Sequence, residues 1–193
     1  MQYDHYKDTC SICRETEEKR NKLMVRTIIF LIIFVVLCID EFSARLIIDS
    51  ISTAEMGNPF PISLRVLRFL CLLILNYYYL TYIQKCIYIE NQYLYIAKLE
   101  KQIFEQSNST VCIEREYKGY NLSQPKFLIF IGWFYKYIIP VSILGITTYA
   151  LIISYEKSIL FYISILLVSQ LLFITIGYIV FHIKVEISYK KDS

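Results

Sequence analysis

Four apolar runs constrain the fold of this chain more than any other feature of its sequence. They cover residues 23–39, 64–83, 137–155 and 158–183. A helix needs about 20 residues to cross the roughly 30 Å hydrocarbon core of a bilayer. It also satisfies its backbone hydrogen bonds within one segment, as lipid requires. The runs therefore predict an all-α integral membrane protein with four transmembrane helices in two hairpins.

The composition favours the membrane class as well. Hydrophobic residues make up 56% of the 193 residues and charged residues only 19%, which exceeds the usual apolar share of globular chains. The net charge of +3 is too small to indicate a nucleic-acid-binding protein. Residues 1–22 are long and mix acidic with basic side chains, unlike the short basic start of a signal peptide. We therefore expect the first span to remain in the mature protein, after a cytosolic N-terminal tail or helix.

Basic residues determine the expected orientation of the spans. Lysine and arginine are frequent in residues 1–26, in residues 84–126 and in the tail 184–193. The connections between the spans of each hairpin carry mixed charges or almost none. Because cytoplasmic segments collect lysine and arginine, both termini and residues 84–126 are expected on the cytoplasmic side.

Residues 84–126 form a polar bridge between the two hairpins, and its first part has a helical pattern. Residues 85–106 contain neither glycine nor proline and can continue the second span. Ile89, Ile96 and Ile103 recur every seven residues, as in a helix–helix seam. The seam has two interpretations: packing against a cytosolic helix of the same chain, or contact between subunits.

The second part of the bridge predicts a short strand-like turn over residues 110–120. Arg115, Lys118 and Tyr120 place cations and an aromatic ring in one compact loop. Such a loop can hold a nucleotide or an oligonucleotide by charge and stacking. A solvated loop beside anionic lipid headgroups explains the same residues.

The remaining boundaries depend on single charged residues. Lys136 is costly at the centre of a bilayer, so the third span is expected to begin at Tyr137, after an interfacial segment over residues 127–135. Pro140 then lies in the first turn of that span. The first span is expected to continue as helix past Asp40, with Glu41 and Arg45 pairing one turn apart.

Two further features belong to the start of the second span. Ser63 is a candidate N-cap after Pro59 and Pro61. Arg65 and Arg68 follow in the first turns, where their long side chains can reach the membrane interface.

Polar residues inside the apolar runs are the candidate functional residues. Ser164, Thr175 and His182 fall on one face of the fourth span, together with Leu171. This stripe can line a water path if subunits surround a pore, or it can hold helices together. Asn76 in the second span has the same two interpretations: a hydrogen bond to a neighbouring helix or a pore constriction.

No pattern indicates an enzyme, a metal site or a cofactor. Cys10 and Cys13 have the spacing of a metal-binding pair with His5 nearby, but no second pair is present, and a structural zinc needs four ligands. We expect them to be reduced thiols on a mobile tail. Glu90 and Glu100 are interpreted as solvated helix charges rather than catalytic acids.

One weak family resemblance comes from the bridge and the entry to the third span. The residues that carry it are Glu90-Asn91-Gln92-Tyr93, Leu99-Glu100, Arg115-Glu116, Tyr120, Pro125 and Trp133. Together they resemble small four-span bacterial membrane effectors of anti-phage defence, such as the Hailong effector paired with a nucleotidyltransferase. The Kiwa membrane component and four-span CRISPR accessory proteins are similar in size and topology. These loose motifs transfer no functional residue.

This resemblance implies a homo-oligomeric gated pore, or a membrane-disrupting protein, in the cell inner membrane. Phage infection would be sensed at the cytosolic bridge, and the implied regulator is a nucleotidyltransferase or its nucleotide product. The alternative from a different class is a non-conducting membrane scaffold that recruits a cytosolic partner through residues 85–106.

Overall fold

The computed structural model describes residues 2–56, 63–107, 130 and 133–192 of the chain. Its helices are α1 (Gln2–Ile39), α2 (Glu41–Met56), α3 (Leu64–Ser107), the π-helix η1 (Phe134–Ile138), α6 (Ile139–Ile153) and α7 (Ile159–Asp192). Four helical segments are long and apolar enough to cross a membrane. The described residues contain no strand. The predicted all-α class with four candidate spans is therefore confirmed, while the strand-like turn at 110–120 lies outside the described residues.

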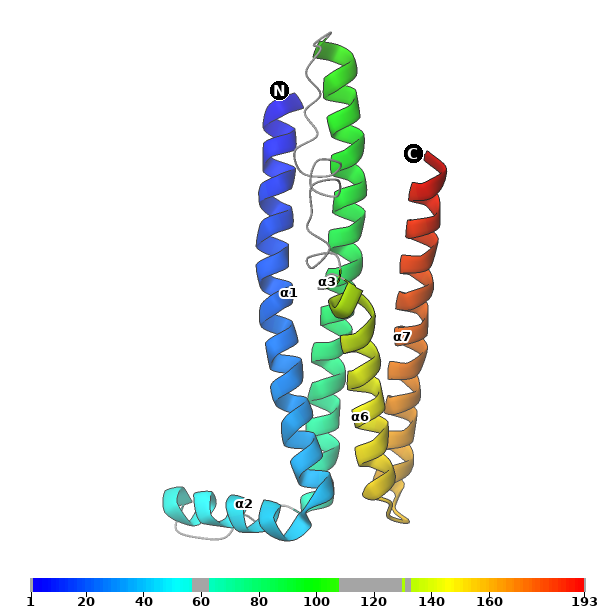
Figure 1. The fold of residues 1–193 in the computed structure, drawn as a ribbon. Helices are drawn as coiled ribbons and strands as arrows, with labels where there is room; N and C mark the ends of the chain where they lie inside the picture. The colour runs from blue at the N-terminus through cyan, green and yellow to red at the C-terminus, as the bar shows by residue number, and fades with distance from the viewer. Residues whose placement is uncertain (1, 57–62, 108–129, 131–132, 193) are drawn as a thin grey trace.

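The four long helices form an up-and-down bundle (Figure 1). Helix α3 packs on α1 and α7, and α6 packs on the same two helices. Both ends of the described chain lie at one end of the bundle, and α2 extends sideways from the opposite end (Figure 1). We call this opposite end the hairpin end, because the α1–α2–α3 and α6–α7 connections lie there.

The inside and the outside of the bundle are both apolar. Phe34, Leu72 and Leu171 are almost fully buried in the core, whereas Phe173 is 80% and Leu166 68% exposed on α7. Large apolar side chains gathered on an outer surface mark a membrane or protein contact. The surface of the bundle therefore suits lipid, in agreement with a multi-pass membrane protein.

Helices α1 and α3 continue together beyond the start of α6 (Figure 1). The 44 residues of α3 span about 66 Å, roughly twice the hydrocarbon thickness. We call residues 4–22 of α1 and 84–103 of α3 the stalk. A second core fills it, formed by Tyr6, Cys13, Ile89, Ile96 and Leu99, with Ile103 packed against them.

This core decides between the two interpretations of the isoleucine seam. Ile89 and Ile96 pack against α1 of the same chain, so the structure supports the intrachain contact. The expected mobile tail is wrong, because residues 2–39 form one helix in which Cys13 is 3% exposed. The apolar seam of α3 provides the surface that orders the N-terminal segment.

The helix of the third candidate span begins earlier than the expected Tyr137. Phe134 and Tyr135, expected in an interfacial segment, belong to η1, where the Ile139 amide bonds to the Phe134 carbonyl five residues before it. A π-turn accommodates a local irregularity in a helix, and Pro140, the second residue of α6, has no amide hydrogen to donate. Lys136 therefore lies within the helix, where its Nζ is 3.4 Å from Glu90 Oε1 on α3.

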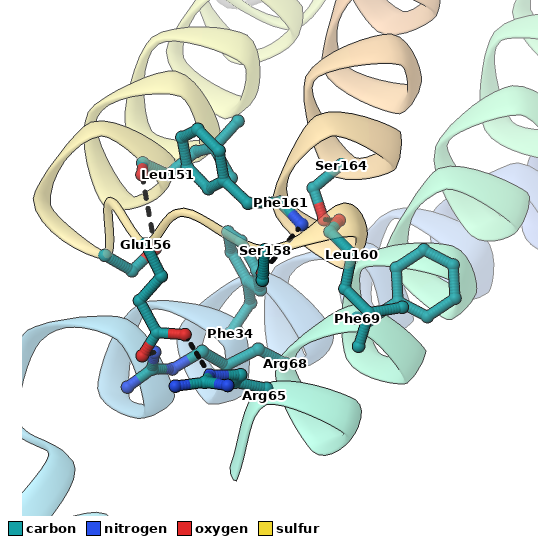
Figure 2. A pocket seen from close by; sticks show the side chains of 11 residues that line it. Phe34, Arg65, Arg68, Phe69, Leu151, Glu156, Ser158, Leu160, Phe161 and Ser164 are labelled. Carbon is teal, nitrogen blue, oxygen red and sulfur yellow. Dashed lines mark hydrogen bonds and ion pairs between the residues drawn. The ribbon is translucent and has the colours of Figure 1, made fainter.

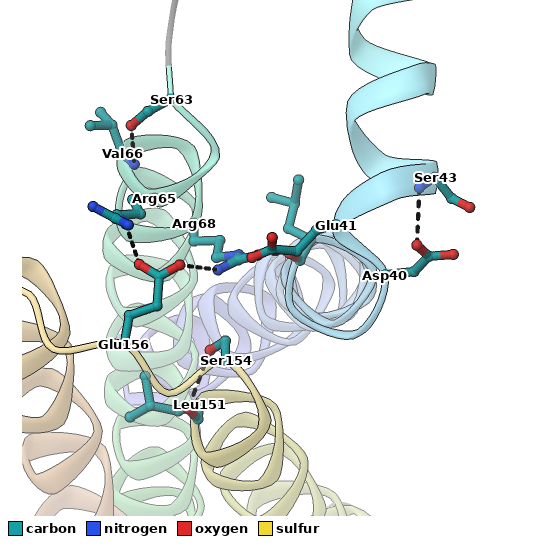
Figure 3. Close-up of polar contacts among 11 residues, drawn as sticks. Asp40, Glu41, Ser43, Ser63, Arg65, Val66, Arg68, Leu151, Ser154 and Glu156 are labelled. Atoms are coloured by element: carbon teal, nitrogen blue, oxygen red, sulfur yellow. Dashed lines mark hydrogen bonds and ion pairs between the residues drawn. The ribbon is translucent and has the colours of Figure 1, made fainter.

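The first span ends at Ile39 instead of continuing past Asp40. Asp40 caps α2: the Ser43 amide donates to its Oδ1 at 3.0 Å. Hydrogen bonds from the side chain and backbone of Ser43 hold the pKa of Asp40 below its usual range. The cap starts a new helix that points away from the bundle (Figure 1), and Glu41 pairs with Arg68 rather than with Arg45 (Figure 3).

Candidate functional site

An ion-pair cluster closes the hairpin end of the bundle (Figure 3). It consists of Glu41, Arg65, Arg68 and Glu156, and we call it the arginine–glutamate cluster. The Arg68 side chain is 9% exposed and hydrogen-bonds Glu41, while its Nη1 lies 3.8 Å from Glu156 Oε1. Arg65 hydrogen-bonds the other oxygen of Glu156.

Arg68 also completes the end of α1. Its Nε donates to the Leu37 carbonyl at 2.7 Å. Leu37 lies in the last turn of α1, where carbonyl groups lack partners within the helix and a cation is favoured by the helix dipole. One guanidinium therefore connects α1, α2, α3 and the turn between α6 and α7.

Residues of the cluster line two cavities. The inner cavity has a volume of about 30 Å³, enough for a water molecule, and Phe34, Leu151 and Ser164 line its wall towards the bundle (Figure 2). The outer cavity has a volume of about 450 Å³ and lies between α2 and the start of α3. Arg65, Arg68 and Glu156 line both cavities.

From the inner cavity, polar side chains follow the contact between α3 and α7. Asn76 Nδ2 donates to the Leu167 carbonyl at 3.2 Å, the predicted bond to a neighbouring helix. One turn further, the hydroxyls of Tyr79 and Thr175 lie 2.6 Å apart. These bonds cross between helices in an otherwise apolar layer.

The line of polar groups ends at His182. This side chain is 1% exposed, and its ring packs edge-on against Tyr178 with 4.5 Å between ring centroids. Tyr137 of η1 packs against the imidazole as well, with 6.2 Å between ring centroids. We call the whole set the polar column: Ser164, Asn76, Tyr79, Thr175, Tyr178 and His182.

The structure thus buries all four predicted span residues inside the bundle: Asn76, Ser164, Thr175 and His182. They face the inside of a single chain, and each is at most 7% exposed. Ser164 and Thr175 also donate to carbonyls of their own helix. The polar column is therefore closed and tightly packed.

The predicted bridge residues divide into two groups. Ile89 and Ile96 are buried in the stalk and Ile103 is half-buried there. Arg115, Lys118 and Tyr120 lie outside the described residues.

Sequence reasoning missed the partners of several polar residues. The interpretation of Glu90 and Glu100 as solvated charges is wrong: Glu90 pairs with Lys136, and buried Glu100 accepts a hydrogen bond from Tyr6 at 3.0 Å. The pairing of Arg68 with Glu156 was missed as well. The signals in the sequence were a cation in the first turns of the second span and an acid in the short connection between the third and fourth spans.

The described residues contain no group of three or more His, Cys, Asp or Glu side chains that could hold a metal ion. Cys13 is buried in the stalk core, and Cys10 lies half-buried beside it. The arrangement suits packing rather than metal binding.

The hydrogen bond between Tyr79 and Thr175 can be measured directly. Tyr79→Phe and Thr175→Val should each lower the free energy of unfolding by about 1 kcal/mol, because each removes one half of a buried interhelical bond. The double variant should lower the free energy of unfolding by less than the sum of the two single losses. Unfolding in detergent micelles, followed by circular dichroism, gives the coupling; strictly additive losses would contradict the bond.

Comparison with protein-family models, with curated proteins and with solved structures gives no match to this chain. The polar column, the arginine–glutamate cluster and the stalk are therefore the features from which a function can be inferred.

Proposed function

We propose that the chain is a gated membrane effector in which the polar column is the conducting path and the stalk is the regulator. The observation that carries this proposal is the continuity of α3. The same helix bears Asn76 and Tyr79 of the column and, further along, Ile89 and Ile96 of the stalk core. Polar groups within membrane spans are costly and mark candidate ion pathways.

Gating in this proposal is a movement of α7 relative to α3. The packed, buried column corresponds to the closed form. Separating the helices breaks the Asn76–Leu167 and Tyr79–Thr175 bonds and lets water reach the polar groups. A force on the stalk tilts α3, because an uninterrupted helix transmits movement along its length.

The proposed setting follows from charge and resemblance. The basic residues flanking the spans favour a cytoplasmic stalk and cytoplasmic termini. The resemblance of Glu90–Tyr93 and the following residues to four-span effectors supports anti-phage defence in the inner membrane, by a homo-oligomer with a nucleotidyltransferase or nucleotide as regulator. Exposed apolar side chains of α7, such as Phe173, supply a surface for a second copy.

The test is membrane potential in bacterial cells that express the protein during phage infection. Wild-type cells should depolarise after infection, and Asn76→Leu should abolish most of this response, because it removes a polar group and an interhelical bond from the path. Gln170→Leu is the matched control: Gln170 is an exposed polar residue on α7, outside the column. Protection from phage without any depolarisation would contradict the pore.

The scaffold remains the second candidate because of one observation. The outward face of the stalk carries exposed Tyr88, Asn91 and Lys98, at spacings that keep them on one side of α3. Aromatic side chains are enriched at protein contacts. A scaffold predicts that Asn76→Leu preserves the phenotype while substitution of Tyr88 abolishes it, the reverse of the pore.

A further inference from the structure

The outer cavity at the hairpin end carries an unusual set of charges. Arg45, Arg65 and Arg68 line it together with Glu41 and Glu156. Three arginines against two carboxylates leave a net charge of +1 in the lining. A ligand with one negative charge would make the site neutral.

The three arginines are not equivalent. Arg68 donates to the Leu37 carbonyl and forms ion pairs with Glu41 and Glu156. Arg65 forms an ion pair with Glu156. Arg45 makes no ion pair or hydrogen bond with any residue that the structure describes, and its side chain is exposed on α2. Arg45 is therefore the cation with its donors still available to a ligand.

The position of the cavity identifies the ligand class. Helix α2 extends sideways from the end of α1, at the level of the span ends, where the bilayer interface is expected (Figure 1). Phe42 is 75%, Leu46 56% and Ile47 51% exposed on this helix, and Phe42 also lines the cavity together with Leu64. A helix that lies in the interface places apolar side chains among acyl chains and cations near headgroups.

We propose that the outer cavity binds the phosphate of an anionic phospholipid headgroup, held by Arg45 with Arg65. The planar guanidinium presents paired N–H donors that match phosphate oxygens. Phe42 and Leu64 contact the apolar start of the lipid, and the bound lipid joins α2 to the first turn of α3. This site needs only the membrane position of the chain and is independent of the proposed conduction.

The experiment uses the full-length protein in a nonionic detergent, titrated by calorimetry. The probes are dioctanoyl phosphatidylglycerol, dioctanoyl phosphatidylcholine and inorganic phosphate. We expect phosphatidylglycerol to bind clearly more tightly than the zwitterionic lipid or phosphate. Arg45→Gln should weaken its binding about tenfold or more, because charge-assisted hydrogen bonds to the phosphate are lost. Arg45→Lys should retain part of the affinity.

Arg26→Gln is the matched control, since Arg26 is an exposed arginine of α1, near the stalk. It should leave the affinity for phosphatidylglycerol unchanged. Arg45 has no partner among the described residues, so Arg45→Gln should keep the elution volume and melting temperature of the wild type. Equal losses in the Arg26 and Arg45 variants, or no loss in either, would overturn the site. Inorganic phosphate binding as tightly as the lipid would identify a free-anion site and overturn the lipid assignment.

Discussion

Replacing Arg68 with leucine should lower the free energy of unfolding by about 2–3 kcal/mol, the largest single effect that the hairpin end offers. The substitution leaves the Leu37 carbonyl at the end of α1 without the hydrogen bond from Arg68. It also removes the contacts of Arg68 to Glu41 and Glu156. A buried acceptor that loses its donor costs desolvation free energy, and the apolar leucine offers no hydrogen bond to offset that cost. Unfolding of the purified protein in mixed micelles, followed by circular dichroism, measures the loss.

Arg65→Leu is the matched control for this prediction. Arg65 belongs to the same helix and pairs with the same Glu156, but its side chain is 59% exposed. Exposed ion pairs contribute about 0–1 kcal/mol, so the control should change stability little. Equal losses in the two variants would show that Arg68 acts as a surface charge and not as the connection between four segments.

The second large effect is expected from Ile96→Asp in the stalk. Ile96 is 1% exposed between Tyr6, Cys13 and Leu99. A carboxylate placed there without a partner costs several kcal/mol, because it is removed from water. Residues 4–22 of α1 should then separate from α3, while the spans keep their own core.

Hydrogen exchange followed by mass spectrometry tests this separation. Amides of residues 4–22 should lose protection in Ile96→Asp, and those of α6 and α7 should keep it. Lys98→Asp is the control, because Lys98 is exposed on the same helix, two positions away. Unchanged protection of residues 4–22 in Ile96→Asp would mean that this part of α1 is ordered without the stalk core. If the proposed gating is correct, Ile96→Asp should also uncouple infection from depolarisation.

The spans could be predicted from the sequence because length and apolarity act locally. Residues 64–83 and 158–183 are each long and apolar enough to cross a bilayer, whatever their neighbours are. The seam of Ile89, Ile96 and Ile103 was also readable, because a seven-residue repeat defines one helix face. The repeat does not name the partner of that face, and only the structure shows that it is α1 of the same chain.

The boundaries that failed all involve polar residues with two possible local roles. Asp40 is compatible with a continuing helix and with a new N-cap, and the Ser43 amide selects the cap. The helix was expected to begin at Tyr137, after Lys136, but it begins before Lys136, whose Nζ lies 3.4 Å from Glu90 Oε1 of the stalk. In both cases a hydrogen-bond partner decides the role of the residue.

The sequence by itself determined that this chain is helical, that four segments suit a bilayer and that one long helix carries an apolar seam. Those properties follow from hydrophobicity and period within a single segment. Only the tertiary structure decided that Asn76, Tyr79 and Thr175 meet in one column and that Arg68 joins Leu37 to Glu156. Such contacts join residues far apart in the chain, and their energy depends on burial and on the partner that packing brings within reach.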